Sequence, residues 1–313
     1  MMQLFRGYFA AAFCVIVWGG TFVSTRFLLL DFSALEIMLI RFLFAWAALS
    51  GWSLLKARGS IRWAGRRELF FAGMGFSGVV AYQFLENCAI YYTNASNVAI
   101  LVSIGPIVTA LFARVFLKDR TLSLNVVLGS LVAMCGAVVV SINGVFELAM
   151  HPLGDLMAIG GMISWGVYSM LIVKANKFRL SALVITRKVF GWAIVMMLPV
   201  AMWGATECGF YAFDGSFSIC TDLEKNIERL LCPLNWINLC FLGFLSSALA
   251  FALWSKACAA LGVVKSAICL YVEPIIAVAF AMFFLGESIS LPGVIGGITI
   301  VAGVYIANRR ARK

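Results

Sequence analysis

Long apolar segments separated by short polar connections run the length of the chain. Each segment has roughly 20 residues, the length that an α-helix needs to cross the hydrocarbon core of a bilayer. We therefore predict an all-α integral membrane protein with ten transmembrane helices. The expected ranges are Tyr8–Leu28, Ala34–Leu54, Leu69–Ala89, Ala95–Phe116, Leu122–Ile142, Gly154–Lys174, Ala182–Thr206, Trp236–Lys256, Val263–Leu285 and Ile289–Ala307.

The composition agrees with a membrane protein. Of 313 residues, 63% are hydrophobic and 12% charged, whereas a soluble domain is roughly half apolar and about a quarter charged. This composition excludes a soluble globular enzyme, a disordered chain and a coiled coil. The net charge of +10 does not indicate nucleic-acid binding, because the basic residues lie between apolar segments and form no patch with aromatic residues.

The sequence shows no sign of a bound cofactor. No glycine-rich nucleotide loop and no His/Cys cluster with zinc-site spacing is present. We therefore expect no cofactor and no metal, and no ATP-driven pumping by this chain alone. The expected partners are a small-molecule substrate, the lipid bilayer and, where transport is coupled, protons.

Basic residues gather in alternate connections, as in residues 56–67 and at the C-terminus, residues 309–313. Among the connections on the other side, only the longest carries any, Lys225 and Arg229. The positive-inside rule therefore places both termini on the inner side (N-in/C-in) of a multi-pass protein in the inner or plasma membrane.

The sequence contains an internal repeat. Trp18-Gly19 recurs as Trp165-Gly166, and Pro106-Ile107 recurs as Pro274-Ile275. We predict two five-helix repeats, residues 1–143 and 152–313, the second with an external loop at 207–235. An odd number of helices inverts the second repeat in the membrane, and secondary transporters bind substrate near the midplane between such repeats.

Four segments resemble the EamA-type proteins of the drug/metabolite transporter superfamily: Trp18-Gly19, Arg41-Phe42, Pro106 to Leu117, and Glu273-Pro274 to Gly286-Glu287. The resemblance covers nearly the whole chain. It implies a ten-helix transporter, often an exporter of amino acids, related metabolites or toxic compounds. Because the superfamily also includes importers and nucleotide-sugar carriers, cargo and direction are not implied. The polar, cysteine-containing segment Glu207–Leu234 departs from the family pattern.

Ionisable residues within the spans are candidate transport residues, because charges are costly there. Arg41 and Glu86 are expected at similar depths and in reach of each other, with Tyr82 one helical turn from Glu86. Glu273 lies near the middle of the ninth span. These groups suit binding of an amino or carboxyl group of the cargo, or proton exchange. The alternatives are a structural ion pair, snorkelling toward the interface, or a hydrogen bond to a neighbouring helix.

Lys188 occupies the position in the second repeat that Arg41 has in the first. Because it lies near the inner end of its span, we expect it to snorkel to the inner surface.

Proline and aromatic residues mark the expected cavity. Pro106 and Pro274 are predicted helix breaks in the fourth and ninth spans. Trp18 and Trp165 fall near mid-span, although tryptophan usually prefers the interface, so we predict an aromatic cavity wall. The other residues expected to line the cavity are Tyr168, Tyr271 and Trp254. Such a wall suits apolar, aromatic or cationic cargo, and plain helix packing is the alternative.

Five glycines in the fifth and tenth spans suit close helix packing within the chain or, as an alternative, a homodimer contact. They are Gly129, Gly136, Gly296, Gly297 and Gly303. Cys208, Cys220 and Cys232 lie in or beside the external loop, where two of them can form a disulfide if that side is oxidising.

The function favoured by the sequence is a secondary active transporter that works by alternating access, most often for efflux of amino acids or metabolites. Two alternatives remain open. One is an integral membrane enzyme, for which His151 near Asp155 is a weak candidate site. The other is a membrane scaffold without transport activity.

Overall fold

The structure, a computed structural model, is built from helices. It describes residues 2–32, 34–56, 65–92, 98, 101–119, 123–142, 152–178, 180–204, 228–286 and 289–309. Within these ranges there is no β-strand. Nine helical segments of the described chain are long and apolar enough to cross a membrane. A further apolar helix, α6 (Gly105–Phe116), is shorter, so the count of ten crossings stays a prediction.

In the described part of the first half, four helical segments besides α6 are long and apolar enough to cross a membrane. Its elements are α1 (Met2–Leu28), α2 (Ala34–Lys56), the 3₁₀ turn η1 (Gly65–Arg67), α3 (Glu68–Gly75), the π-helical segment η2 (Phe76–Ala81), α4 (Tyr82–Tyr92) and α7 (Leu124–Ile142). Because η1, α3, η2 and α4 follow one another without a gap, they form one crossing with a π-helical insert.

The second half repeats this order. Its elements are α8 (Pro152–Ala175), the 3₁₀ turn η3 (Asn176–Phe178), α9 (Ala182–Gly204), α11 (Pro233–Cys240), the π-helical segment η4 (Phe241–Leu249), α12 (Ala250–Leu261), α13 (Val263–Cys269), the 3₁₀ turn η5 (Leu270–Val272), α14 (Glu273–Leu285) and α15 (Leu291–Asn308). The third crossing of each half thus contains a π-helical segment.

The eighth span is longer than expected. It runs from Pro233 to Leu261, so Lys256 lies inside the helix and not at its end. Gly262, with a φ of 84°, makes the sharp corner between α12 and α13, because a residue with a side chain rarely adopts this conformation.

The helices pair in the way expected of an inverted repeat. In one set of contacts α1 packs along α12 and α14, and in the equivalent set α8 packs along α4 and α6. Likewise α2 packs on η4, and α9 packs on α3 and η2. The helix pairs α2–α9 and α7–α15 join equivalent elements of the two halves. The predicted fold class, a helical membrane protein built from inverted repeats, is confirmed, whereas the boundaries at 143 and 152 stay predictions.

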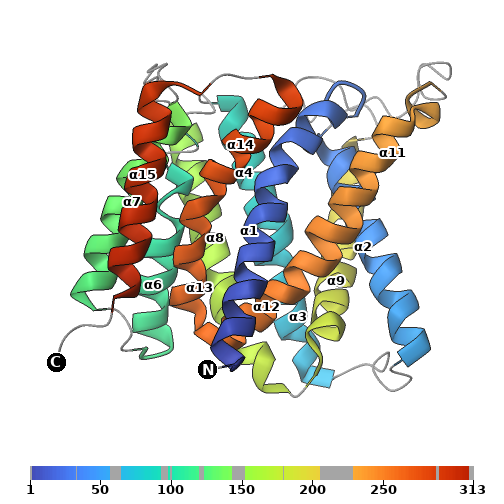
Figure 1. Cartoon of the computed structure of the whole chain (residues 1–313). Coiled ribbons are helices and arrows are strands. Elements are labelled where there is room, and N and C mark those ends of the chain that lie inside the picture. Colours follow the sequence, from blue (N-terminus) through green and yellow to red (C-terminus); the bar gives the residue numbers. More distant parts are fainter. Residues whose placement is uncertain are drawn as a thin grey trace.

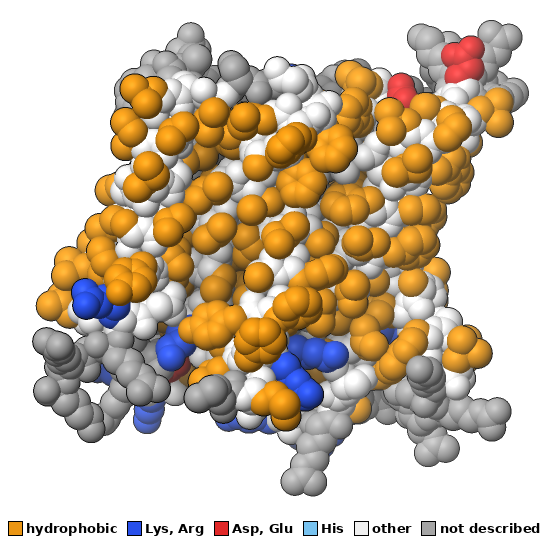
Figure 2. All heavy atoms as spheres, in the orientation of Figure 1, with side chains coloured by type: hydrophobic (Ala, Val, Ile, Leu, Met, Phe, Trp, Pro, Cys, Tyr) orange, Lys and Arg blue, Asp and Glu red, His pale blue; other side chains and the backbone are white. Residues whose placement is uncertain are grey.

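The outer surface is apolar. Figure 2 shows hydrophobic side chains over most of the visible face and Lys and Arg side chains only near its lower edge. The exposed hydrophobic side chains of the described residues include Phe283, which is 86% exposed, and Leu55, which is 85% exposed. Figure 1 places the start of α1 and the end of α15 at this same lower edge. So large an exposed apolar area requires a lipid environment.

The contact between α7 and α15 depends on glycine. A Cβ atom added to Gly129 would lie 2.3 Å from the backbone nitrogen of Ala307, and one added to Gly136 would lie 2.6 Å from the carbonyl oxygen of Gly296. These distances mean that the two backbones touch. Figure 1 shows the two helices side by side. Gly303 belongs to the same contact, whereas a Cβ on Gly297 would meet nothing nearer than Ile275, at 3.9 Å.

Two expectations fall on residues that the structure does not describe. These are the pairing of Cys208 or Cys220 and the site at His151. Cys232, at the start of the eighth crossing, is a half-buried free thiol.

Candidate functional site

An aromatic cluster lies where the two halves meet. The ring centroids of Trp18 on α1 and Trp165 on α8 are 6.1 Å apart, edge to face. Trp254 of α12 lies 5.3 Å from Trp18, and Tyr82 of α4 lies 5.3 Å from Trp165. Tyr168, one turn along α8, is 5.1 Å from Trp165. The structure thus brings together four of the five predicted aromatic substrate-binding residues and Trp254.

Tyr271 is the exception. It is 2% exposed and lies in the 3₁₀ turn η5, which packs against α7, α13, α14 and α15. Among the described residues, no ring contact joins it to the cluster.

The two π-helical segments hold the cluster in equivalent ways. The indole N–H of Trp18 donates to the carbonyl oxygen of Ser246 in η4, at 3.1 Å. In the other half, the hydroxyl of Ser164, beside Trp165, donates to the carbonyl oxygen of Ser77 in η2, at 2.9 Å. Each first helix therefore bonds to a π segment of the opposite half. Such π segments are rare and are often found at functional sites.

Arg41 lies on α2 and is held by two serines of η4. Its Nε donates to the hydroxyl of Ser247 at 3.1 Å, and its Nη2 donates to the hydroxyl of Ser246 at 3.2 Å. Arg41 is 8% exposed, and both serines are fully buried. Because the carbonyl of Ser246 accepts from Trp18, this one residue links the guanidinium to the aromatic cluster.

Glu86 is joined to the cluster through Tyr82, whose hydroxyl donates to the Oε1 of Glu86 at 3.1 Å. The expected direct pair between Arg41 and Glu86 is not present among the described contacts. The Glu86 carboxyl group nevertheless lies near enough to Arg41 and to Glu273 for their charges to affect one another. One buried cation and two carboxyl groups therefore share the interior beside the aromatic rings, where unpaired charge is costly.

The two prolines lie at equivalent interruptions of the fourth and ninth crossings. Pro106 is in the first turn of α6, after the turn at Ser103–Ile104, and Pro274 is in the first turn of α14, after η5. A first-turn proline is compatible with the helix, because the N–H that it lacks would have no partner there. Glu273 begins α14 at this interruption.

Glycines let the helices approach the cluster closely. A Cβ on Gly78 of η2 would lie 2.3 Å from the ring of Tyr168, and one on Gly19 would lie 2.7 Å from Ile276 of α14. Even the methyl side chain of alanine at position 78 would therefore clash with the Tyr168 ring.

Some residues of the site were not identified from the sequence. Ser246 and Ser247 bind Arg41, and Phe251 lies 5.6 Å from Trp18. The adjacent serines within an apolar segment were a signal that was available, since hydroxyl groups in a span often bond to another helix.

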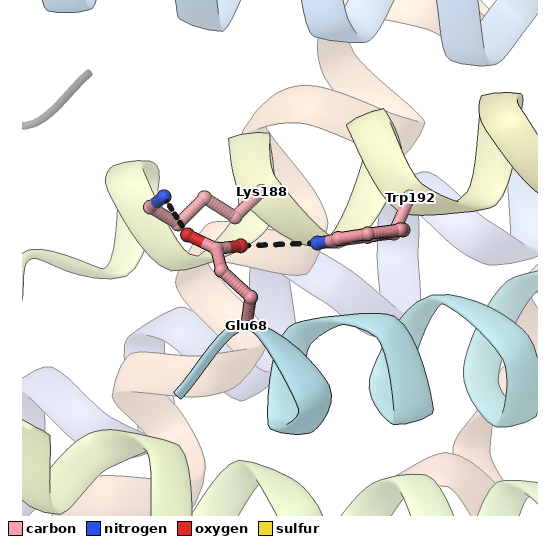
Figure 3. Close-up of polar contacts among 3 residues, drawn as sticks. All are labelled: Glu68, Lys188 and Trp192. Carbon is pink, nitrogen blue, oxygen red and sulfur yellow. Dashed lines mark hydrogen bonds and ion pairs between the residues drawn. The ribbon is translucent and has the colours of Figure 1, made fainter. Parts of the chain in front are cut away.

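The expectation for Lys188 was wrong. Its ammonium group forms an ion pair with the carboxylate of Glu68 at the start of α3, and the two side chains are 10% and 6% exposed. Trp192, one turn along α9, donates its indole N–H to the other carboxylate oxygen at 3.0 Å. Figure 3 shows Lys188 and Trp192 pointing to Glu68 from the same helix. Lys188 does not snorkel because this buried partner is within reach.

Known proteins resemble this chain in sequence and in fold. It is 27% identical over 310 residues to a probable terminal-alkyne amino-acid exporter of Streptantibioticus cattleyicolor, covering 99% of this chain and 95% of the relative. It is 25% identical over 304 residues to an uncharacterized transporter of Archaeoglobus fulgidus, covering 96% of each. A crystal structure with 18% identity superposes with a TM-score of 0.73 over 96% of both chains, which shows a shared fold.

The relatives are transporters by name, which indicates a transporter and not an enzyme. The EamA-like transporter family matches residues 5–142 and 215–309. This match covers most of the chain and confirms the resemblance noted in the sequence. The chain therefore belongs to the EamA-like transporter family.

Proposed function

We propose that the protein is a secondary transporter that exports small organic metabolites, with amino acids as the favoured class, by alternating access between its two halves. One observation carries this proposal. The buried residues Trp18, Trp165 and Arg41 and the half-buried Glu86 converge from both halves onto one site, where inverted-repeat transporters bind their cargo. The amino-acid exporter among the relatives supports the cargo class.

The chemistry of the site suits an amino acid. The guanidinium of Arg41 has N–H groups beyond those bonded to serine, and these can bind a carboxylate. Glu86 and Glu273 can bind the ammonium group of the cargo or carry a proton in exchange. The rings of Trp18 and Trp165 can stack on an apolar or aromatic side chain.

The orientation follows from the basic residues. They gather at the end of the molecule where α1 begins and α15 ends (Figures 1 and 2). The positive-inside rule assigns this end to the cytoplasm and the opposite end to the outside of the inner or plasma membrane. The ends called inner and outer below follow this assignment.

Reconstitution in liposomes with an internal pH dye tests the proposal. A panel of amino acids, aromatic amines, nucleosides and cationic drugs is added to the wild type and to the Glu86→Gln and Glu273→Gln variants. We expect cargo-dependent proton flux that is lost in at least one of the two. Glu228→Gln, which removes an exposed carboxylate outside the site, is the matched control.

The outcomes separate the parts of the proposal. Cargo movement without proton flux, unchanged in both variants, would leave a uniporter or exchanger and give both carboxylates structural roles. No movement of any compound by folded protein would contradict the proposed cargo class.

A further inference from the structure

Two ion pairs lie at opposite ends of the molecule, and each joins one half to the other. Glu68, at the start of α3, pairs with Lys188 of α9. At the other end Glu36, in the first turn of α2, pairs with Arg229, which precedes α11, with 3.1 Å between Oε1 and Nη2. The ends are opposite because α2 begins where α1 finishes its crossing, and α3 begins only after α2 has returned.

The two pairs join corresponding elements of the two halves. Helices α2 and α9 are the second crossings of their halves, and Arg229 and Glu68 lie at the starts of the third crossings. Exchanging the halves therefore exchanges the elements that the two pairs join, although the paired residues themselves are not at aligned positions, since Lys188 aligns with Arg41. The carboxylate is on the second crossing at the outer end, and the ammonium is on the second crossing at the inner end.

At the inner end, the pair is enclosed. Lys188 Nζ lies 5.6 Å from the ring centroid of Phe71, and Trp192 holds the second oxygen of Glu68. Arg187 also interacts electrostatically with Glu68. Glu68 as a whole is 4% exposed, so water has little access to this carboxylate.

At the outer end, the pair has a similar setting. The guanidinium of Arg229 lies over the ring of Phe32, 4.8 Å from its centroid, and donates to the carbonyl of Asp31 at 3.2 Å. Asn235 donates to the Asp31 carboxylate at 2.7 Å. Arg229 and Glu36 side chains are 19% and 14% exposed. Both ends thus combine an acid, a base, an aromatic ring and a further N–H donor.

We infer that these pairs are the two latches of the alternating-access cycle: Glu68–Lys188–Trp192 closes the inner end and Glu36–Arg229 closes the outer end. The inference rests on the proposed function. In an inverted repeat, the two halves exchange conformations, so a contact between equivalent elements that is formed at one end in one state is opened at that end in the other state. Both ion pairs are formed in this structure.

The chemistry of an ion pair suits a latch. Separating two buried charges is costly while both stay buried, but the cost falls when water enters and hydrates them. An ion pair therefore holds an end closed until that end opens far enough to admit water. An apolar contact would instead expose hydrophobic surface to water on opening.

Hydrogen–deuterium exchange of the purified full-length protein, followed by mass spectrometry, tests the latches. In Glu68→Gln we expect exchange in residues 68–75 and 182–192 to rise about tenfold, because a weakened latch raises the open population. At the same time exchange in residues 34–40 and 228–240 should fall. In Glu36→Gln we expect the reverse. The control Lys177→Gln removes an exposed charge outside the monitored segments and should leave both ends unchanged.

The opposite responses of the two ends distinguish a latch from a structural ion pair. A rise confined to the mutated end, or no change at either, would overturn the inference. Where Glu68→Gln does not fold, Trp192→Phe removes only the indole donor and should give a smaller shift of the same sign. If the two ends respond in opposite directions but the protein moves no cargo, the proposed function alone is contradicted. If the protein moves cargo but the two ends do not respond in opposite directions, the latches alone are contradicted.

Discussion

Trp18 and Trp165 contact each other edge to face, with ring centroids 6.1 Å apart. They occupy equivalent positions, one on the first helix of each half. Contact between equivalent residues places the approximate twofold axis that relates the halves between these two rings. Any movement of one half against the other therefore acts on this contact and on the site around it.

The two tryptophans differ in one respect that can be measured. Trp18 is 7% exposed and Trp165 is 8% exposed, but only Trp18 donates a hydrogen bond from its indole among the described contacts. We expect Trp18→Phe to lower the free energy of unfolding by about 1 kcal/mol more than Trp165→Phe, because only Trp18→Phe removes the hydrogen-bond donor of the Ser246 carbonyl. Thermal unfolding followed by fluorescence measures this difference. Equal losses in the two variants would show that the bond to Ser246 contributes nothing.

The close approach at Gly78 gives a second prediction. Since its Cβ would lie 2.3 Å from the Tyr168 ring, we expect Gly78→Ala to displace this ring and to destabilise the protein by about 1–3 kcal/mol. Gly161→Ala is the matched control on the neighbouring helix face, because its Cβ would lie 3.6 Å from the nearest atom, the Tyr82 carbonyl. Thermal unfolding of both variants tests this, and a control as unstable as Gly78→Ala would contradict the steric explanation.

Hydrophobicity and repetition were sufficient to predict the crossings and the central tryptophans. The segment Val263–Leu285 was predicted with the bounds that the structure has, because long apolar segments are a direct consequence of the lipid environment. Trp18 and Trp165 were identified from their mid-span positions and their repetition. The spans can be recognised from one segment at a time, and the repeated tryptophans from the comparison of two aligned segments.

Contacts between distant crossings could not be predicted in the same way. The pair Glu68–Lys188 joins residues that are 120 positions apart, and Glu68 lies just before the span predicted to begin at Leu69. Hydropathy does not report which faces of two helices meet, so Lys188 was expected to reach the membrane surface. The π segments that present Ser246 and Ser77 likewise have no hydropathy signal, because they change the hydrogen-bond register and not the residue types.

The glycine contact between α7 and α15 predicts an unequal effect of alanine. Gly136→Ala would place a Cβ 2.6 Å from the Gly296 carbonyl oxygen, whereas Gly297→Ala would place one 3.9 Å from Ile275. We expect Gly136→Ala to lower stability by about 1–3 kcal/mol and Gly297→Ala to have little effect. Unfolding in detergent measures both. Loss of a dimer without loss of monomer stability in Gly136→Ala would instead support the homodimer contact.

The serines that hold Arg41 give the most direct test of the cargo site. Removing both hydroxyls in Ser246→Ala/Ser247→Ala leaves two guanidinium N–H groups without acceptors and frees the side chain to turn. If Arg41 binds a carboxylate of the cargo, the affinity of the double variant for the cargo should be about tenfold or more lower than that of the wild type, which is on the order of 1.4 kcal/mol. The measurement is the shift in unfolding temperature that the transported amino acid produces in wild type and variant. Ser53→Ala is the control, since Ser53 is fully buried but bonds only to Leu49 of its own helix. Unchanged affinity in the double variant would mean that cargo binding does not depend on the position in which these serines hold Arg41. The guanidinium would then be assigned to packing between α2 and η4.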